Sequence, residues 1–335
     1  MAGETITIPE PSADRWMYPS NGTPGTRPQA STFSALPDGG GADDRFGQFV
    51  FKFDTAAAGI PAGLGAANYQ ISSISVTATI AQDRLFLYDP TRDSRFTYGA
   101  MALPDDDAGR PLELHGTGFR NGFTAGTFLE NSAYGGGNPS RRNAFALGFD
   151  ENAAPRDASN NVTEDFESGA WAVGKIDGLS PGAEVPVDTV VRFTIDLTAP
   201  GVSGYVREGL DRGFIWLTLS SLHPALKQGG EFVSYYTRDD AVHQLFGDAA
   251  PTLELTWTPP SGFTSFSRDS AGQVALEFLG LPGFSYILQA SPDLTENSWE
   301  NLETFSPAAT GTLSWQGNSL QPKRFFRISS TPSTP

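Results

Sequence analysis

Clustered carboxylates are the residues whose types and spacing most directly suggest chemistry. Asp105, Asp106 and Asp107 stand together directly before Ala108-Gly109. Calcium prefers such hard oxygen ligands, although the segment lacks the glycine and the closing glutamate of an EF-hand loop. Two interpretations follow: a structural calcium ion that stiffens the loop, or a solvated acidic turn. Three more aspartates precede the cluster and offer further oxygen ligands: Asp83, Asp89 and Asp93.

Aromatic and basic side chains in loop-like segments suggest a second chemistry, the recognition of sugars. An aromatic ring offers an apolar face for a pyranose ring, and the polar edge of Tyr or Trp can bind hydroxyl groups. The aromatic candidates are Trp16, Tyr18, Tyr98, Tyr134 and Trp171. Arg141 and Arg142 lie in a glycine-rich segment and could face an acidic glycan. The alternative is that the rings belong to the core and that the arginine pair is solvated.

The sequence shows no complete catalytic motif. Ser220 and Ser221 precede His223, but neither serine lies in a Gly-x-Ser-x-Gly turn. The other histidines, His115 and His243, give no zinc-ligand spacing. A carboxylate pair of the glycosidase type remains open. The candidates by residue type are Glu113, Glu130, Glu164, Glu167 and Glu231. Among 38 acidic residues these five are not diagnostic, so we expect no enzyme and no cofactor other than the calcium ion.

The composition excludes several classes of function. The 335 residues include no cysteine, which excludes disulfides, thiolate metal sites and cysteine nucleophiles. Acidic residues outnumber basic ones by 38 to 22, and the net charge of −16 argues against nucleic acid as a partner. No apolar run reaches the roughly 18 residues that span a bilayer, so we expect no membrane insertion. The chain has four lysines: Lys52, Lys175, Lys227 and Lys323.

The elements that must position these residues are expected to be strands, because apolar and polar residues alternate along them. The segment Ile74–Ile80 alternates without a fault, and Phe49, Phe51 and Phe53 share one face of another expected strand. Phe214–Leu219 is apolar on both faces, which predicts a central strand. Helical signal is limited to Tyr205–Asp211 and to Asp239–Phe246, with Asp239 as the expected N-cap. The fold class predicted is therefore all-β, with long loops between the strands.

A domain boundary is predicted at Thr258-Pro259-Pro260-Ser261-Gly262, because proline cannot donate to a strand ladder. Shorter strands at regular spacing follow it, which is typical of a small β-sandwich. We therefore divide the chain into a large jelly-roll-like β-sandwich at 1–258, a linker at 259–262, a small sandwich at 263–329 and a flexible tail at 330–335.

The carboxy-terminal part resembles a known module. Gly283–Leu294, Ser298-Trp299 and Arg324–Ile328 are similar to a short, truncated fibronectin type III domain found in exported proteins of planctomycetes and verrucomicrobia. This resemblance implies a spacer or surface-attachment role and no catalysis.

The large domain resembles, more distantly, β-sandwich modules of the DNRLRE type, which are linked to carbohydrate binding on bacterial surfaces. The similar segments are Asp14-Arg15-Trp16, Gly47–Asp54, Ile60-Pro61, 71–80 and Ala250–Leu255. The middle of the chain departs from that pattern, so the resemblance transfers no binding residues.

Taken together, the residues and resemblances predict a non-enzymatic binding protein for polysaccharide or a cell-envelope glycan. Met1-Ala2-Gly3-Glu4 shows no signal peptide, and we interpret the chain as the mature form of a secreted or cell-surface protein. A self-assembling envelope or filament protein is the first alternative, with exposed edge strands as its means of self-association. A carbohydrate-active enzyme that uses a carboxylate pair is the second.

Overall fold

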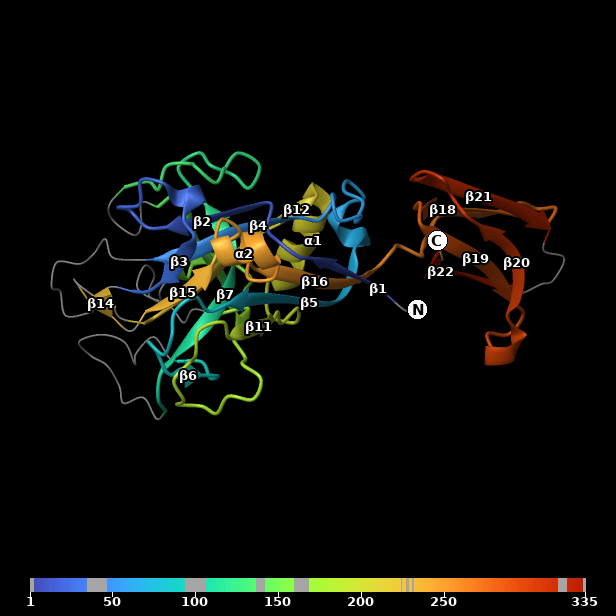
Figure 1. Ribbon diagram of the computed structural model, residues 1–335. Coiled ribbons are helices and arrows are strands. Elements are labelled where there is room, and N and C mark those ends of the chain that lie inside the picture. Colours follow the sequence, from blue (N-terminus) through green and yellow to red (C-terminus); the bar gives the residue numbers. More distant parts are fainter. Residues whose placement is uncertain are drawn as a thin grey trace. The chain divides into compact units, whose positions relative to one another are not determined.

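The chain forms two compact units of all-β architecture, as a computed structural model shows (Figure 1). The structure describes residues 3–34, 47–93, 107–136, 142–159, 169–223, 225–226, 229–230, 232–318 and 324–333. The larger unit comprises 6–63 and 73–255, and the smaller unit comprises 1–5, 64–72 and 256–335. The predicted all-β sandwich is confirmed, because antiparallel sheets account for the described fold.

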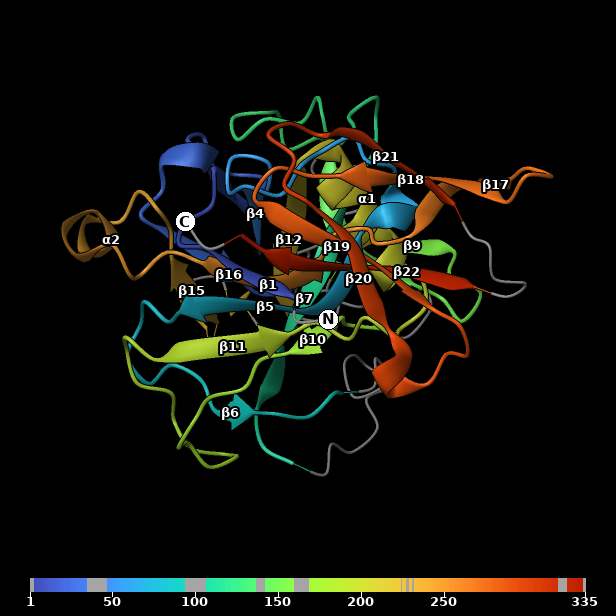
Figure 2. The same ribbon diagram turned by 90° about the vertical axis from the view of Figure 1, so that its right-hand side faces the viewer.

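Two main sheets build the sandwich of the large domain. The four-stranded sheet has the order β1 (Glu4–Ile8), β16 (Thr252–Thr258), β5 (Gln70–Thr79) and β11 (Val190–Thr194). The eight-stranded sheet runs β2 (Ala13–Met17), β4 (Gln48–Asp54), β12 (Phe214–Ser221), β7 (Arg110–Phe119), β8 (Ala144–Phe149) and β9 (Pro155–Asp157). Two short strands also pair with β7, namely β10 (Ala172–Val173) and the parallel β6 (Tyr88–Asp89). Figure 2 shows β16, β1, β5 and β11 side by side in one layer.

Two small ribbons complete the strands of the large domain. One pairs β3 (Gln29–Thr32) with β15 (Val233–Tyr236), and the other pairs β13 (Ala225–Leu226) with β14 (Gly229–Gly230). Tyr235 of β15 also forms an isolated bridge with Ile80, just beyond β5. The β3–β15 ribbon is thereby held beside the end of the four-stranded sheet.

Strand alternation places the core between the sheets. Phe49, Phe51 and Phe53 of β4 are fully buried, and Phe51 lies directly opposite Leu217 of β12. The predicted central strand is confirmed, because β12 lies between β4 and β7 and is buried along nearly its whole length. Buried apolar residues of β5, β11 and β16 complete this core: Ile74, Val76, Ala78, Val191, Phe193, Leu253 and Leu255.

The opposite face of the eight-stranded sheet carries a second apolar cluster. Its buried members are Ala13, Met17, Val50, Phe128, Ala144 and Trp216. The Phe128 ring meets the Trp216 ring edge-on, with centroids 5.6 Å apart. The segment after β7 therefore covers the face of the sheet that points away from the main core, and β4 and β12 are buried on both sides.

Two α-helices are described, and both differ in detail from the prediction. The first, α1, spans Val202–Arg212 and so begins before the expected Tyr205. The second, α2, spans Ala241–Phe246 and is capped by Asp240, not by the expected Asp239. Asp240 has extended backbone angles, and its Oδ1 accepts the Val242 N–H at 2.7 Å, which is the geometry an N-cap requires. Neither described helix has the length and apolarity needed to cross a membrane.

The smaller unit contains two three-stranded sheets. The first has the order β17 (Phe263–Arg268), β18 (Gln273–Gly280) and β21 (Gly311–Asn318). The second has the order β20 (Glu300–Phe305), β19 (Phe284–Ser291) and β22 (Phe325–Pro332). The sequence did not predict β17, whose residues lack a buried face. The flexible tail predicted from 330 begins too early, because Ser330 and Thr331 pair with Tyr286 and Ser285 of β19.

Packing around Gly116 of β7 gives a test of the large domain. A Cβ atom at this position would lie 2.2 Å from Cη2 of the Trp171 indole, so Gly116→Ala forces the ring or the strand to move. We expect the free energy of unfolding to fall by about 1–3 kcal/mol in urea denaturation. The matched control is Gly204→Ala in α1, where nothing lies within 4 Å and alanine is expected to add about 0.5–1 kcal/mol. Equal effects of the two substitutions would contradict the packing described.

Candidate functional site

A groove of about 620 Å³ lies on the outer face of the eight-stranded sheet. Strand register builds its floor, because Lys52 of β4 lies between Ala13 of β2 on one side and Trp216 of β12 on the other. The segments 22–26 and 128–131 line it as well. Its volume falls within the range of about 300–1,000 Å³ that is usual for ligand sites.

Lys52 is the basic group of the groove. Its ammonium lies 5.3 Å from the ring centroid of Phe214 and 5.7 Å from that of Trp216. In the part of the chain that the structure describes, no carboxylate lies within salt-bridge distance of Lys52. The Trp216 indole donates to the Ala125 carbonyl at 3.0 Å, which fixes the ring in the floor. Hydroxyl and amide groups line the rest of the groove: Ser12, Thr23, Thr26 and Asn131.

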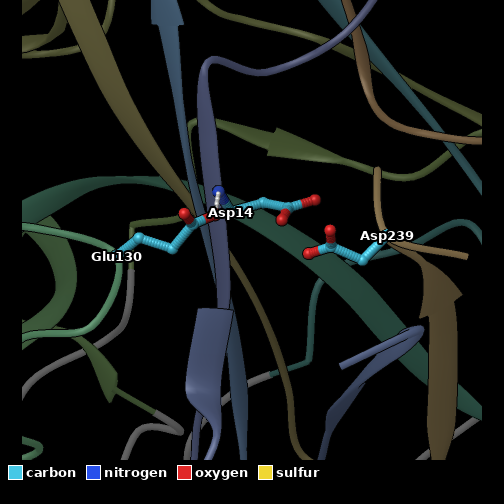
Figure 3. A group of neighbouring side chains, drawn as sticks. All are labelled: Asp14, Glu130 and Asp239. Carbon is cyan, nitrogen blue, oxygen red and sulfur yellow. Dashed lines mark hydrogen bonds between the residues drawn. The ribbon is translucent and has the colours of Figure 1, made fainter. Parts of the chain in front are cut away.

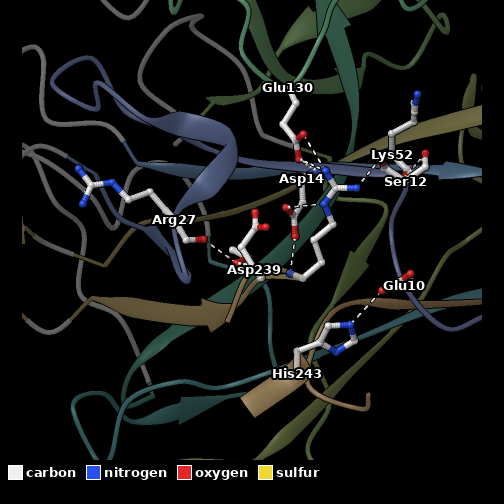
Figure 4. A network of polar contacts seen from close by, with 10 residues as sticks. Glu10, Ser12, Asp14, Arg27, Lys52, Glu130, Asp239 and His243 are labelled. Atoms are coloured by element: carbon white, nitrogen blue, oxygen red, sulfur yellow. Dashed lines mark hydrogen bonds and ion pairs between the residues drawn. The ribbon is translucent and has the colours of Figure 1, made fainter. Parts of the chain in front are cut away.

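An arginine joins two acidic side chains next to the groove (Figure 4). Arg238 Nη2 donates to both oxygens of Glu130, at 2.8 and 2.7 Å, and Glu130 also lines the groove. The Arg238 backbone N–H donates to Asp14 Oδ2 at 2.8 Å. Asp14 in turn donates its own backbone N–H to Glu130 Oε1 at 2.9 Å. These bonds join three segments that are far apart in the sequence.

Asp14, Glu130 and Asp239 bring carboxylate oxygens to within 4.8 Å of one another (Figure 3). Asp14 is buried, and this burial raises its pKa from 3.8 to about 7, whereas the backbone hydrogen bond from Arg238 and its charge act in the opposite direction. Three oxygen ligands of this kind could hold a cation. Arg238 supplies a positive charge there, 3.7 Å from Asp14 Oδ1 and 2.7 Å from Glu130 Oε2, so the cluster also forms an internal ion network.

The structure brings two of the predicted sugar-binding residues together. The rings of Trp16 and Tyr18 are half-buried and stacked, with centroids 4.7 Å apart and an interplanar angle of 18°. Phe33 meets both rings edge-on. The Trp16 indole donates to the Ser31 carbonyl at 2.9 Å. One face of each ring is therefore covered by the other ring, and the pair forms a single aromatic step at the end of β2.

The structure also shows the contacts of three other predicted binding residues. Trp171 is 1% exposed and stacks on Phe149, so it has no open face for a sugar ring. Arg142 is equally buried and donates to Gln48 Oε1 at 3.1 Å, and burial lowers its pKa. Both results correct the expectation of a solvent-facing role. Tyr134 packs against the second apolar cluster. The remaining two, Tyr98 and Arg141, lie outside the described residues.

The predicted calcium ligands are described in part. Carboxylate oxygens of Asp107, Asp89 and Asp93 lie within 4.8 Å of one another, so the structure places two of the suggested further ligands beside Asp107. Thr91 Oγ1 lies 2.7 Å from Asp89 Oδ1 and 2.6 Å from Asp107 Oδ2, and its one proton can be donated to either carboxylate. Arg110 binds Asp93 Oδ2 at 2.7 Å. Asp83 lies beside Arg84 instead, whereas Asp105 and Asp106 are outside the described residues.

The residues considered for catalysis do not assemble into a catalytic pair among the described parts. Glu113 is buried beside His115 at 3.5 Å. The imidazole nitrogens of the buried His223 have no hydrogen-bond partner in the described part of the chain, and burial lowers the pKa of this side chain to about 3. Ser221 donates to Thr32. The other candidates of the carboxylate-pair alternative, Glu164, Glu167 and Glu231, lie outside the described residues.

Sequence reasoning missed Lys52, Trp216 and Arg238. A signal for Lys52 exists, because it is one of four lysines and interrupts the apolar strand Phe49–Phe53. Its neighbour Trp216 could not be identified without the register that joins β4 to β12. Arg238 precedes two aspartates, and nothing in the sequence indicates that it reaches Asp14 and Glu130.

The pKa of Asp14 predicts a pH effect on stability. Between pH 4 and pH 7 the folded chain holds a proton on Asp14 that the unfolded chain has released. The free energy of unfolding therefore falls as the pH rises through this window, by at most about 4 kcal/mol from this group. Asp14→Asn removes the titration and should flatten the profile measured by urea denaturation. The control Asp177→Asn, at an exposed position, should leave it unchanged, and parallel profiles for wild type and Asp14→Asn would contradict this account.

The calcium prediction has its own test. If Asp89, Asp93 and Asp107 hold a structural calcium ion, millimolar calcium raises the unfolding temperature and EDTA lowers it, because the ion binds only the folded state. Asp107→Asn should remove most of this response, whereas Asp177→Asn should keep it. Differential scanning calorimetry with magnesium as the reference ion measures the effect. An unfolding temperature that is the same in calcium and in EDTA would show that the cluster holds no structural calcium ion.

Comparison with known proteins does not assign the chain to a family. No protein-family model matches it, and the search of curated proteins gave no match. The resemblances to DNRLRE-type and fibronectin type III modules therefore stay predictions, as does self-association through edge strands. Function is argued below from the geometry of the site.

Proposed function

We propose that the protein is a non-enzymatic polysaccharide-binding protein and that the groove over Lys52 and Trp216 is its binding site. The observation that carries the proposal is a lysine without a carboxylate partner among the described residues, placed beside the Phe214 and Trp216 rings in the floor of a groove. The groove combines an apolar floor with hydroxyl and amide groups, which suits a sugar chain with an apolar ring face and many hydroxyl groups.

The charge of the groove favours an acidic glycan. Glu130, its carboxylate, is bound to Arg238 by two hydrogen bonds and is thereby neutralised. Lys52 has no such partner in the described structure, so it can form a charge-assisted hydrogen bond with a uronate carboxylate or a sulfate ester. A neutral polysaccharide would leave this ammonium without a counter-charge.

The surroundings of the carboxylates support binding over hydrolysis. A glycosidase needs one carboxyl group as acid and a second as nucleophile or base, both open to the substrate. Asp14 has the raised pKa of an acid, but only 1% of its surface is exposed and it does not line the groove. Glu130 faces the groove with both oxygens engaged by Arg238.

We further propose that the protein is secreted or located on the cell surface. This location follows from the resemblance of the two domains to modules of exported proteins, and it would give the groove access to polysaccharides of a cell envelope or an extracellular matrix.

Substitution of Lys52 tests the binding site. Affinity electrophoresis or calorimetry of the full chain would compare alginate, dextran sulfate and neutral dextran. We expect the acidic polymers to bind, and Lys52→Gln to weaken that binding about tenfold through the loss of a charge-assisted hydrogen bond. Lys52→Arg retains the charge and should bind nearly as well as wild type.

Two further results would decide the proposal. The control Arg84→Gln removes the same charge from an exposed side chain outside the groove, and it should leave the affinity unchanged. Equal affinities of wild type and Lys52→Gln would place the site elsewhere. Release of reducing ends from any polymer that binds would refute the non-enzymatic part of the proposal.

A further inference from the structure

A second cavity, of about 360 Å³, shares no residue with the groove. Its lining comes from the segment after β6, from β10 and from residues at the end of β11. Lys175 is held beside β11 by an isolated bridge to Arg192. The cavity therefore lies on a part of the large domain where short strands meet the four-stranded sheet.

Two cations, Arg92 and Lys175, line this cavity together with one carboxylate, Asp196. The Arg92 guanidinium donates to the Ala170 carbonyl, and the Lys175 ammonium donates to the Pro90 carbonyl. Both cations are on exposed residues. Within the described ranges, no carboxylate lies within salt-bridge distance of either cation, although the charges of Arg92 and Asp196 attract each other. The cavity therefore holds two positive charges and one negative charge.

Several other cations of the described chain bind a carboxylate directly. Arg110 binds Asp93, Arg120 binds Asp157, and Arg238 binds Glu130. Arg92 and Lys175 bind backbone carbonyls instead, and they face one cavity whose lining holds a single carboxylate. Two cations beside one carboxylate give this lining a net positive charge on a protein of net charge −16.

A neutral indole N–H and an acidic carboxylate also line this cavity. The indole N–H of Trp171 is buried and has no hydrogen-bond acceptor in the described part of the chain. Asp196 accepts two hydrogen bonds from Thr198, and these lower its pKa, so its carboxylate stays ionised. An ionised carboxylate accepts hydrogen bonds from hydroxyl groups but repels anions. The cavity therefore offers cations to the charged group of a ligand and a carboxylate to its hydroxyl groups.

We propose that this cavity binds an acidic sugar residue through its oxyanion, with Arg92 and Lys175 on the carboxylate or sulfate group and Asp196 on ring hydroxyls. Arginine and lysine form charge-assisted hydrogen bonds with such oxyanions, and the volume is at the lower end of the range for small-molecule sites. The proposal does not depend on the groove, because the two sites have no residue in common.

Calorimetric titration of the full chain at low ionic strength tests this site with four probes: glucuronate, glucose 6-sulfate, inorganic sulfate and glucose. We expect glucuronate and glucose 6-sulfate to bind, glucose not to bind, and added sodium chloride to weaken the binding. The double variant Arg92→Gln/Lys175→Gln should raise the Kd at least about tenfold. Arg92→Lys and Lys175→Arg keep the charges and should retain most of the affinity.

A matched variant tests whether the effect is specific to this cavity. Arg84→Gln removes one exposed charge outside the cavity and should bind like wild type. Circular dichroism and the unfolding midpoint check that each variant is folded. If the double variant does not fold, the charge-conserving variants still test the site. Absence of binding by wild type or unchanged binding by the double variant would each overturn the proposal. Inorganic sulfate that binds as tightly as glucose 6-sulfate would overturn its sugar component.

Discussion

The alternation of β4 between two buried faces is the constraint on which the rest of the large domain depends. One face carries Phe49, Phe51 and Phe53 into the core between the sheets, so Gln48, Val50 and Lys52 must point to the other side. A shift of one residue in the pairing of β4 would turn the ammonium into the core between the sheets and the phenylalanines to the face of the second apolar cluster. The apolar core therefore fixes the position of Lys52 beside Trp216, and the groove is a consequence of the same register.

Two sets of described cations have different surroundings. Arg110, Arg120 and Arg238 bind carboxylates in partly buried positions and compensate the acidic side chains that folding brings together. Lys52, Arg92 and Lys175 instead contact aromatic rings or backbone carbonyls and face cavities. This difference is the common physical basis of the two proposals.

The fold class and many strands follow from the sequence, because alternation and Gly-Pro-rich connections are local signals. The segment Ile74–Ile80 except its last residue, the phenylalanines of β4 and the central strand at 214–219 lie in strands as predicted. β17 could not be predicted in this way, because none of its residues is buried and hydrophobicity does not mark it. The candidate site was even harder to predict from the sequence, because the partners of Lys52 and Arg238 depend on strand register and on long-range contacts. Trp171 and Arg142 were predicted to bind a ligand but are buried, because residue type alone does not distinguish a binding side chain from a buried one.

The pairing of β1 with β16 has a consequence for how the chain reaches its native state. β1 is the edge strand of the four-stranded sheet, and its one neighbour there, β16, is formed by residues 252–258. During synthesis the amino-terminal strand therefore has no partner in this sheet until β16 has left the ribosome. Contacts of such large sequence separation form slowly, because the loop entropy must be lost before they contribute. β1 thus stays without its partner in this sheet until residues 252–258 are made, whereas β2 can pair with β4 much earlier.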